Sequence, residues 1–172
     1  CDGNIFALIN ESYKAIGDSS KGLEYVAKGH ELFPQNINLL FELSVHYLSN
    51  EDYKTALKYA DSAIATDQSH AQFYLIKGRC HMSLGEDSKG ISAFKNCAKA
   101  DPTYEWGYVY IAIYYYNKCV EFGDINDNNR FDIEDTMLSS YEAAEKAFNL
   151  TKEINVKMQM AEMLQDLSYE LK

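Results

Sequence analysis

The spacing of the two prolines constrains the fold of this 172-residue chain more than any other feature. Pro34 and Pro102 are its only prolines, and a sequence shift of 68 superposes one on the other. The same shift also superposes Gly17 on Gly85. A fixed period of roughly 20 to 50 residues is typical of helical repeat proteins. Half of 68 is 34, so the spacing of the prolines fits two lengths of a 34-residue repeat.

The 34-residue period divides the chain into four segments, each with two amphipathic helical patterns and a polar turn. In the second segment, residues with helical spacing precede the polar turn Asn50–Asp52, and a second such pattern follows it. Proline stands where the second helix must end, because it cannot continue a helix. The predicted repeats are 3–36, 37–70, 71–104 and 105–158, the last with an insertion near 117–140.

This pattern resembles the tetratricopeptide repeat (TPR) family over nearly the whole chain. The residues that carry the resemblance are Leu40, Leu43, Ser44, Tyr47, Ala56 and Ala63 in the second repeat, and Tyr74, Gly78, His81, Gly85, Phe94 and Pro102 in the third. The sequence departs from the family pattern at Asn10, Gly29 and Gln68. The resemblance implies an all-α fold: a single domain over 1–172 that forms a right-handed α-solenoid of antiparallel helix pairs.

The tail has apolar residues at helical spacing, among them Met160, Met163, Leu167 and Leu171. We expect a capping helix over 159–172, because solenoids need a cap on the apolar face of their last repeat. The alternative is a helix that docks a partner or mediates self-association, which would make the chain part of a larger repeat array or a homo-oligomer.

The insertion in the fourth repeat predicts that both of its helices run longer than the others. Long fourth repeats of this kind also occur in the bacterial cell-envelope TPR proteins that the chain resembles. Within the insertion, oxygen-bearing side chains follow the spacing of an EF-hand calcium loop, and Phe131–Ile133 fits the short extended pairing of such loops. The candidate Ca²⁺ ligands are Asp124, Asn126, Asn128, Arg130, Asp132 and Asp135. A plain polar turn is the alternative interpretation, because Asn and Asp are common turn residues.

The TPR resemblance also implies that the first helix of each pair lines a concave groove. Helical spacing then predicts an apolar and aromatic groove that binds a protein or peptide with apolar anchors. Its residues are Phe41, Val45, Leu48, Leu75, Arg79, Met82, Trp106, Val109, Tyr110, Ile113 and Tyr116. The first repeat contributes smaller or polar residues, such as Ala7, Glu11 and Lys14. Because these positions hold no set of basic residues, the carboxylate clamp of chaperone-binding TPR proteins is excluded.

Charge and motifs exclude several other functions. The formal net charge is −10, which argues against nucleic acid, since its binding needs Lys and Arg to replace counterions. No apolar run of about 18 residues is present, so no membrane span is predicted. None of the four histidines falls in a nucleophile or metal motif, and no phosphate-binding glycine loop occurs. We therefore expect a non-enzymatic scaffold without a cofactor, unless the 124–135 loop binds Ca²⁺ and makes the chain calcium-responsive.

The four cysteines predict buried free thiols rather than a disulfide framework. The alternative is an approach of Cys80 and Cys97 across a helix pair. Cys1 at the first position fits the lipidated residue of a bacterial lipoprotein, which together with the resemblance favours the periplasm or cell envelope. A cytoplasmic location is the alternative.

Overall fold

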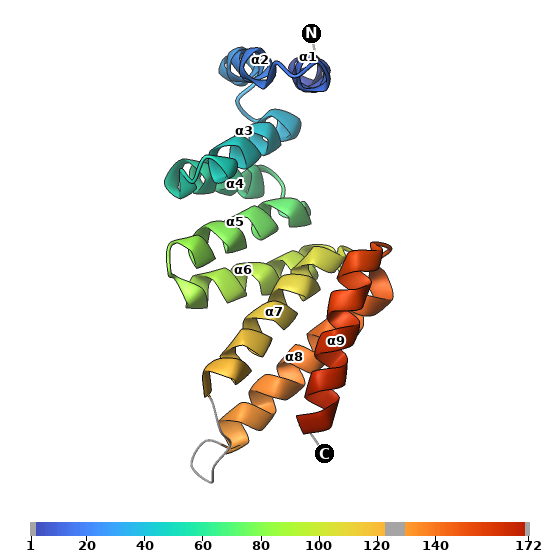
Figure 1. Ribbon diagram of the computed structural model, residues 1–172. Helices are drawn as coiled ribbons and strands as arrows, with labels where there is room; N and C mark the ends of the chain where they lie inside the picture. The colour runs from blue at the N-terminus through green and yellow to red at the C-terminus, as the bar shows by residue number, and fades with distance from the viewer. Residues whose placement is uncertain (1–2, 123–129, 171–172) are drawn as a thin grey trace. The chain divides into compact units, whose positions relative to one another are not determined.

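The computed structural model describes residues 3–122 and 130–170, and over these residues the chain is built of α-helices with no strand (Figure 1). This confirms the predicted all-α fold. The helices are α1 (Asn4–Ala15), α2 (Ser19–Leu32), α3 (Ile37–Ser49), α4 (Tyr53–Thr66), α5 (Ala71–Ser83), α6 (Asp87–Ala100), α7 (Glu105–Phe122), α8 (Arg130–Leu150) and α9 (Ile154–Glu170).

The helix ends follow the period predicted from the prolines. The helices α2, α4 and α6 end at Leu32, Thr66 and Ala100, at intervals that reproduce the 34-residue period. Pro34 and Pro102 each lie two residues past a helix end, as expected for a residue that cannot continue a helix.

The turn inside each of the first three helix pairs has one residue with left-handed backbone. These residues are Gly17 (φ 83°), Glu51 (φ 61°) and Gly85 (φ 72°), which follow the same period. After each of them, the next backbone N–H reaches back to a carbonyl near the end of the preceding helix, at 2.9 Å for Asp18 to Tyr13 and 3.0 Å for Asp52 to Tyr47. A left-handed residue that closes a helix is usually glycine, so Glu51 is the exception.

Side-chain caps fix the helix starts that follow. The Asp18 carboxylate accepts a hydrogen bond from the backbone N–H of Lys21 at the start of α2, and Asp52 does the same for Thr55 at the start of α4, both at 3.2 Å. Each bond satisfies a backbone donor that has no partner within the helix. These caps explain why α2 and α4 each begin two residues after the left-handed turn residue.

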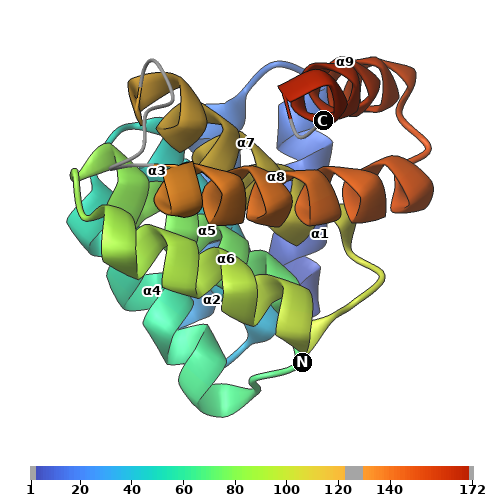
Figure 2. The ribbon, with the colours of Figure 1, turned by 90° about the horizontal axis from the view of Figure 1, so that it is seen from below.

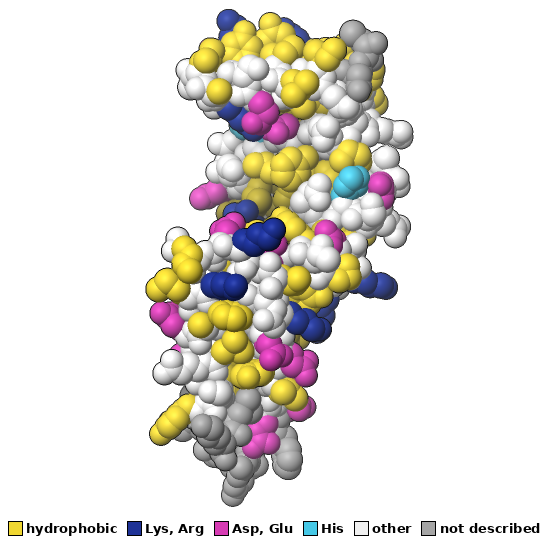
Figure 3. Space-filling view, turned by 90° about the vertical axis from the view of Figure 1, so that its right-hand side faces the viewer, with side chains coloured by type: hydrophobic (Ala, Val, Ile, Leu, Met, Phe, Trp, Pro, Cys, Tyr) yellow, Lys and Arg dark blue, Asp and Glu magenta, His cyan; other side chains and the backbone are white. Residues whose placement is uncertain are grey.

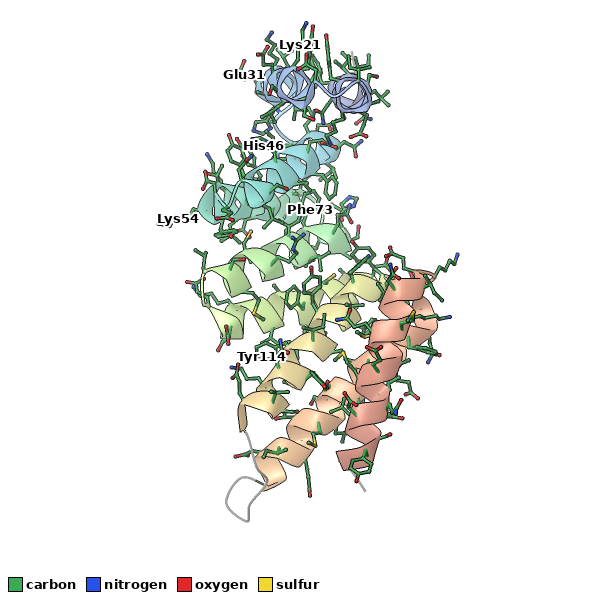
Figure 4. All side chains as sticks on the ribbon, viewed as in Figure 1. Lys21, Glu31, His46, Lys54, Phe73 and Tyr114 are labelled. Carbon is green, nitrogen blue, oxygen red and sulfur yellow. The ribbon has the colours of Figure 1, made fainter. Side chains whose placement is uncertain are left out.

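The internal contacts divide the chain into two compact units, 1–93 and 94–172, with the boundary inside α6. In the N-terminal unit α1 pairs with α2 and α3 with α4, and α5 packs against α3 and α4 (Figure 1). Phe73 of α5 is fully buried in the larger core cluster of this unit (Figure 4). The buried members of that cluster are Leu40, Leu48, Ala56, Ala60, Ala63, Phe73, Ile76 and Cys80.

The C-terminal unit is built around a long helix pair. The helices α7 and α8 have 18 and 21 residues, whereas α1 to α6 have 12 to 14. This confirms the predicted lengthening. The buried Ser140 of α8 donates a hydrogen bond to the Ala112 carbonyl of α7 at 3.0 Å, which joins the two helices in their core.

The tail helix α9 lies beside α8, joined to it by a short connection (Figures 1 and 2). It begins at Ile154, five residues before the predicted start of the cap. Its buried side chains include Met160 and Met163, and Leu167 packs with Ile133 and Met137 of α8. The predicted apolar positions Met160, Met163 and Leu167 are therefore buried against the rest of the C-terminal unit, while Leu171 lies outside the described residues.

Candidate binding surface

In the N-terminal unit, the first helices α1 and α3 are joined by a polar network. The Glu42 carboxylate of α3 accepts hydrogen bonds from Asn10 at 2.7 Å and from Lys14 at 2.6 Å. Lys14 also donates to Glu11 at 2.9 Å. Burial alone lowers the pKa of Lys14, but the hydrogen bonds to Glu42 and Glu11 outweigh it and raise that pKa above its ordinary value. Lys14 is thus engaged by two carboxylates.

Two of the groove residues predicted for α3 are only half-buried, but a third is not on the surface. Phe41 and Val45 pack against the larger core cluster, and the Phe41 ring meets Phe73 edge-on at 6.0 Å. Leu48 is 9% exposed and is a member of that cluster. The prediction for Leu48 is therefore wrong, because a side chain buried among α3, α4 and α5 offers nothing to a partner.

Of the groove residues predicted on α5, some face solvent and one packs against the neighbouring helix α6. Arg79 is exposed and Leu75 is half-buried. Met82 lies over Gly90 of α6, and a Cβ added there would be 2.8 Å from the Met82 Cε. Gly90 therefore makes room for Met82, which fills space inside the helix pair.

On α7, the predicted groove residues again include one core residue. Val109 is 2% exposed, so its assignment to a groove is wrong for the same reason as that of Leu48. Tyr110 stacks on the buried Phe94 of α6 with ring centroids 4.8 Å apart, and Trp106 tilts against Tyr110 at 6.4 Å. These two aromatic side chains are half-buried and form a surface backed by the core.

The last two predicted residues of α7, Ile113 and Tyr116, face a cleft between α7 and α9 of about 260 Å³. The Tyr116 hydroxyl donates a hydrogen bond to Asp166 of α9 at 2.9 Å. That bond, followed by burial, raises the pKa of Tyr116. The cleft is lined by Ile113, Tyr116, Asn117, Gln159, Glu162, Met163 and Asp166.

The sequence analysis does not predict the residues that α9 contributes to this cleft. The helical spacing of Met160, Met163 and Leu167 predicts a buried stripe on the tail helix, but it does not predict a cleft beside that stripe. Glu162 and Asp166 stand at the edge of that apolar stripe, four residues apart and on one side of the helix. The sequence feature that could have indicated the cleft is this pair of carboxylates beside Met163. The sequence does not show, however, which helix the pair faces.

A second hollow of about 310 Å³ lies in the C-terminal unit and was not predicted. Lys95 donates a hydrogen bond to the Tyr115 hydroxyl at 2.8 Å, and the Lys146 ammonium lies 5.4 Å from the Tyr108 ring centroid. Both lysines are exposed. The lining residues are Lys95, Tyr108, Ile111, Tyr115, Ser139, Glu142, Ala143 and Lys146.

The predicted calcium loop lies largely outside the described residues, which do not include Asp124, Asn126 and Asn128. The helix α8 begins at Arg130, so Asp132 and Asp135 lie in its first turns. The extended pairing expected at 131–133 is therefore wrong. The described ranges contain no group of three or more His, Cys, Asp or Glu residues that could hold a metal ion. Calcium binding stays a prediction.

Three cysteines in the described part of the chain are free thiols, as predicted, while Cys1 lies outside it. Burial raises the pKa of Cys80 to about 11 and that of Cys97 to about 12. Both thiols are thus protonated at neutral pH and are poor nucleophiles.

None of the helices in 3–122 and 130–170 is long and apolar enough to cross a membrane.

No known protein-family model matches the chain. Its fold is similar to that of several solved structures. MamA protein is 16% identical, with 97% of this chain and 86% of that chain covered and a TM-score of 0.65. A thermophilic TPR protein from Thermus thermophilus is 13% identical, with 95% and 100% covered and a TM-score of 0.58.

The chain is also similar to the TPR2AB domain of yeast Sti1, solved in a complex with pHSP90. There the identity is 16%, the coverage is 96% of this chain and 69% of that chain, and the TM-score is 0.54. At these identities the likeness bears on the fold. Together with the 34-residue recurrence of helix ends and turns, it shows that the chain has the all-α, TPR-like fold of a helical-repeat solenoid.

Proposed function

We propose that the chain is a non-enzymatic scaffold that binds a partner protein or peptide, and that the cleft between α7 and α9 of the C-terminal unit is the anchoring site. The partner packs an apolar side chain against the half-buried Ile113 and Tyr116 and places a basic residue near Glu162 and Asp166.

The composition of the cleft carries this proposal. Half-buried Ile113 and Tyr116 supply apolar surface that is already backed by packed helices, so little ordering is needed on binding. The carboxylates of Glu162 and Asp166 stand beside it. An apolar centre with a charged rim is the arrangement that peptide-binding surfaces commonly use.

The fold similarity and the charge of the chain point the same way. One structural neighbour, the Sti1 domain, was solved in a complex with pHSP90, which supports peptide or protein binding as a use of this architecture. The net charge of −10 favours faster association with a basic partner.

The experiment is a selection from a phage-displayed random peptide library on the full chain, followed by fluorescence anisotropy with the selected peptides. We expect these peptides to share an apolar residue flanked by Lys or Arg. Ile113→Asp should weaken their binding at least about tenfold, because it puts a charge on the apolar wall of the cleft.

Leu138→Asp is the matched control. Leu138 is a 49% exposed residue of α8 that does not line the cleft. This variant should bind the peptides as the wild type does. Equal losses for the two variants, or selected peptides with no apolar residue in common, would refute binding at the cleft.

A further inference from the structure

The hollow of about 310 Å³ in the C-terminal unit combines lysines with tyrosines, and the proposed function does not use it. Helices α7 and α8 form its walls, and Lys95 of α6 completes the lining. The lining residues of α7 follow helical spacing, and so do those of α8. They are Tyr108, Ile111 and Tyr115 on α7, and Ser139, Glu142, Ala143 and Lys146 on α8.

The packing of α7 on α8 sets the order of these residues along the hollow. The two helices run in opposite directions (Figure 1), and the hydrogen bond from Ser140 to the Ala112 carbonyl places these two positions at one level. Tyr115 and Ser139 therefore lie towards one end of the hollow. Tyr108 lies towards the other end.

Each end of the hollow holds one ammonium group. Lys95 donates a hydrogen bond to the Tyr115 hydroxyl at 2.8 Å, and its ammonium lies 5.3 Å from the centroid of that ring. At the other end, the Lys146 ammonium lies 5.4 Å from the Tyr108 ring centroid. Because these tyrosines are seven residues apart, they are separated by about 10 Å along α7.

In the part of the chain that the structure describes, neither of these ammonium groups is neutralised by a carboxylate. Lys95 and Lys146 contact tyrosines instead. By contrast, Lys14, Lys77 and Lys89 each form an ion pair with an acidic side chain. The two positive charges of the hollow are therefore available to an anionic ligand.

Two hydroxyl groups stand at the Lys95 end of the hollow. The Tyr115 oxygen accepts the hydrogen bond from Lys95, so its own O–H remains as a donor. The half-buried Ser139 hydroxyl has no hydrogen-bond partner among residues 3–122 and 130–170. An anion at this end therefore meets an ammonium group and hydroxyl donors, which form the stronger, charge-assisted kind of hydrogen bond.

The middle of the hollow has a different character from its ends. Its floor is apolar, since Ile111 is 8% exposed and Ala143 is 6% exposed. The exposed Glu142 lies one helical turn before Lys146 and repels an acidic group placed mid-way. The hollow thus favours a ligand with an acidic group at each end and an uncharged middle.

The rest of the surface narrows the class of ligand. Over the face of the molecule in Figure 3, basic and acidic side chains are interspersed. The net charge of −10 disfavours a polyanion such as nucleic acid. A peptide with only two carboxylates adds little repulsion, because exposed charges more than about 8 Å away are largely screened at physiological salt.

We propose that this hollow binds an acidic peptide segment of a partner protein, with one carboxylate at Lys95, the other at Lys146 and an apolar stretch between them. In the polyproline II conformation, side chains three residues apart lie on one side at about 9 Å, which matches the separation of the two tyrosines. This site goes beyond the proposed function, because it shares no lining residue with the α7–α9 cleft and selects the opposite charge.

Fluorescence anisotropy of the full chain with a labelled peptide tests this proposal. The probe is an end-capped peptide with the core Glu-Leu-Pro-Glu between Gly-Ser segments, in which the proline favours the polyproline II conformation. Its control has glutamine in place of both glutamates. The acidic peptide should bind, and the glutamine peptide should bind at least about tenfold more weakly.

Variants of the protein locate the binding site. Lys95→Met and Lys146→Met each remove one charge and keep an unbranched apolar stem, and each should weaken binding at least about threefold. Glu142→Gln should tighten binding about twofold, because it removes the repulsion at mid-hollow. Lys99→Met is the matched control: this exposed lysine of α6 does not line the hollow, so binding should stay unchanged. Circular dichroism checks that each variant is folded.

Three results would overturn the proposal. Equal binding of the acidic and the glutamine peptide would exclude recognition of the carboxylates. An equal loss in Lys99→Met and in the two hollow variants would show that binding follows the overall charge of the protein. Binding of suberate, a short dicarboxylic acid, as tightly as the peptide would show that the hollow takes small diacids instead of a peptide.

Discussion

At the scale of single residues, the turn and core positions recur with the 34-residue period, and the departures from the pattern are informative. Asn10 stands where a small residue is usual, and the structure buries it at 3% exposure with its amide bonded to Glu42. Its partner lies on the next helix pair, so this buried amide links two pairs.

Glu51 is the one left-handed turn residue of the three that is not glycine, with φ of 61°. A side chain in this region has a steric cost, whereas glycine has only a larger loss of chain entropy on folding. Glu51→Gly should therefore raise the free energy of unfolding by about 0.5 to 1 kcal/mol, measured by urea denaturation. Glu51→Ala, which keeps the Cβ, should bring no such gain, and an equal gain in both variants would argue against backbone strain.

Glu86 supports a turn through its side chain. Its carboxylate accepts hydrogen bonds from Lys89 at 2.9 Å and from the buried His81 at 2.6 Å. These bonds, that of Lys89 first, hold the pKa of Glu86 below its ordinary 4.5. A carboxyl whose pKa is lower in the folded state stabilises above its ordinary pKa, and this contribution is lost as pH falls through the folded value.

Glu86→Gln should accordingly be less stable than the wild type at about pH 7, and the two should converge towards about pH 3. The measurement is the free energy of unfolding of both proteins over that pH series. A stability difference that stays constant down to the acid end would show that the carboxylate charge is not responsible.

At the scale of helices, the sequence predicted the pairs, their period and the longer α7 and α8. It succeeded there because helix starts and ends depend on local signals such as caps, left-handed turns and proline. It failed for side-chain exposure on the first helices. Phe41, Leu75 and Val109 occupy one repeat position, yet Val109 is buried and the other two are half-buried. Exposure at such a position depends on the neighbouring helices, which differ from one repeat to the next.

Gly107 marks a close approach between α6 and α7. A Cβ added there would lie 2.9 Å from the backbone nitrogen of Ala98 and 3.2 Å from the Cys97 Sγ. Gly107→Ala should lower the free energy of unfolding by about 1 to 3 kcal/mol, despite the better helix propensity of alanine. Chemical denaturation measures it, with Asn96→Ala on the exposed face of α6 as a control that should stay within about 0.5 kcal/mol. A stabilised Gly107→Ala variant would contradict the close packing.

At the scale of the whole molecule, the proposed function rests on one surface, the cleft between α7 and α9. The α7–α9 cleft combines apolar walls with carboxylates and is proposed to hold a partner's side chains. The sequence predicted a groove on the first helices, but not that α9 would supply one wall of the cleft, because the packing of the tail decides this.

The most direct test of the central claim, that α7 and α9 form the binding site, is amide chemical-shift mapping of the full chain with a selected peptide. The account predicts the largest shifts at Ile113, Asn117, Glu162 and Asp166, and their loss in Ile113→Asp. Shifts concentrated instead around Lys95, Tyr108 and Lys146, or spread evenly over the chain, would contradict it.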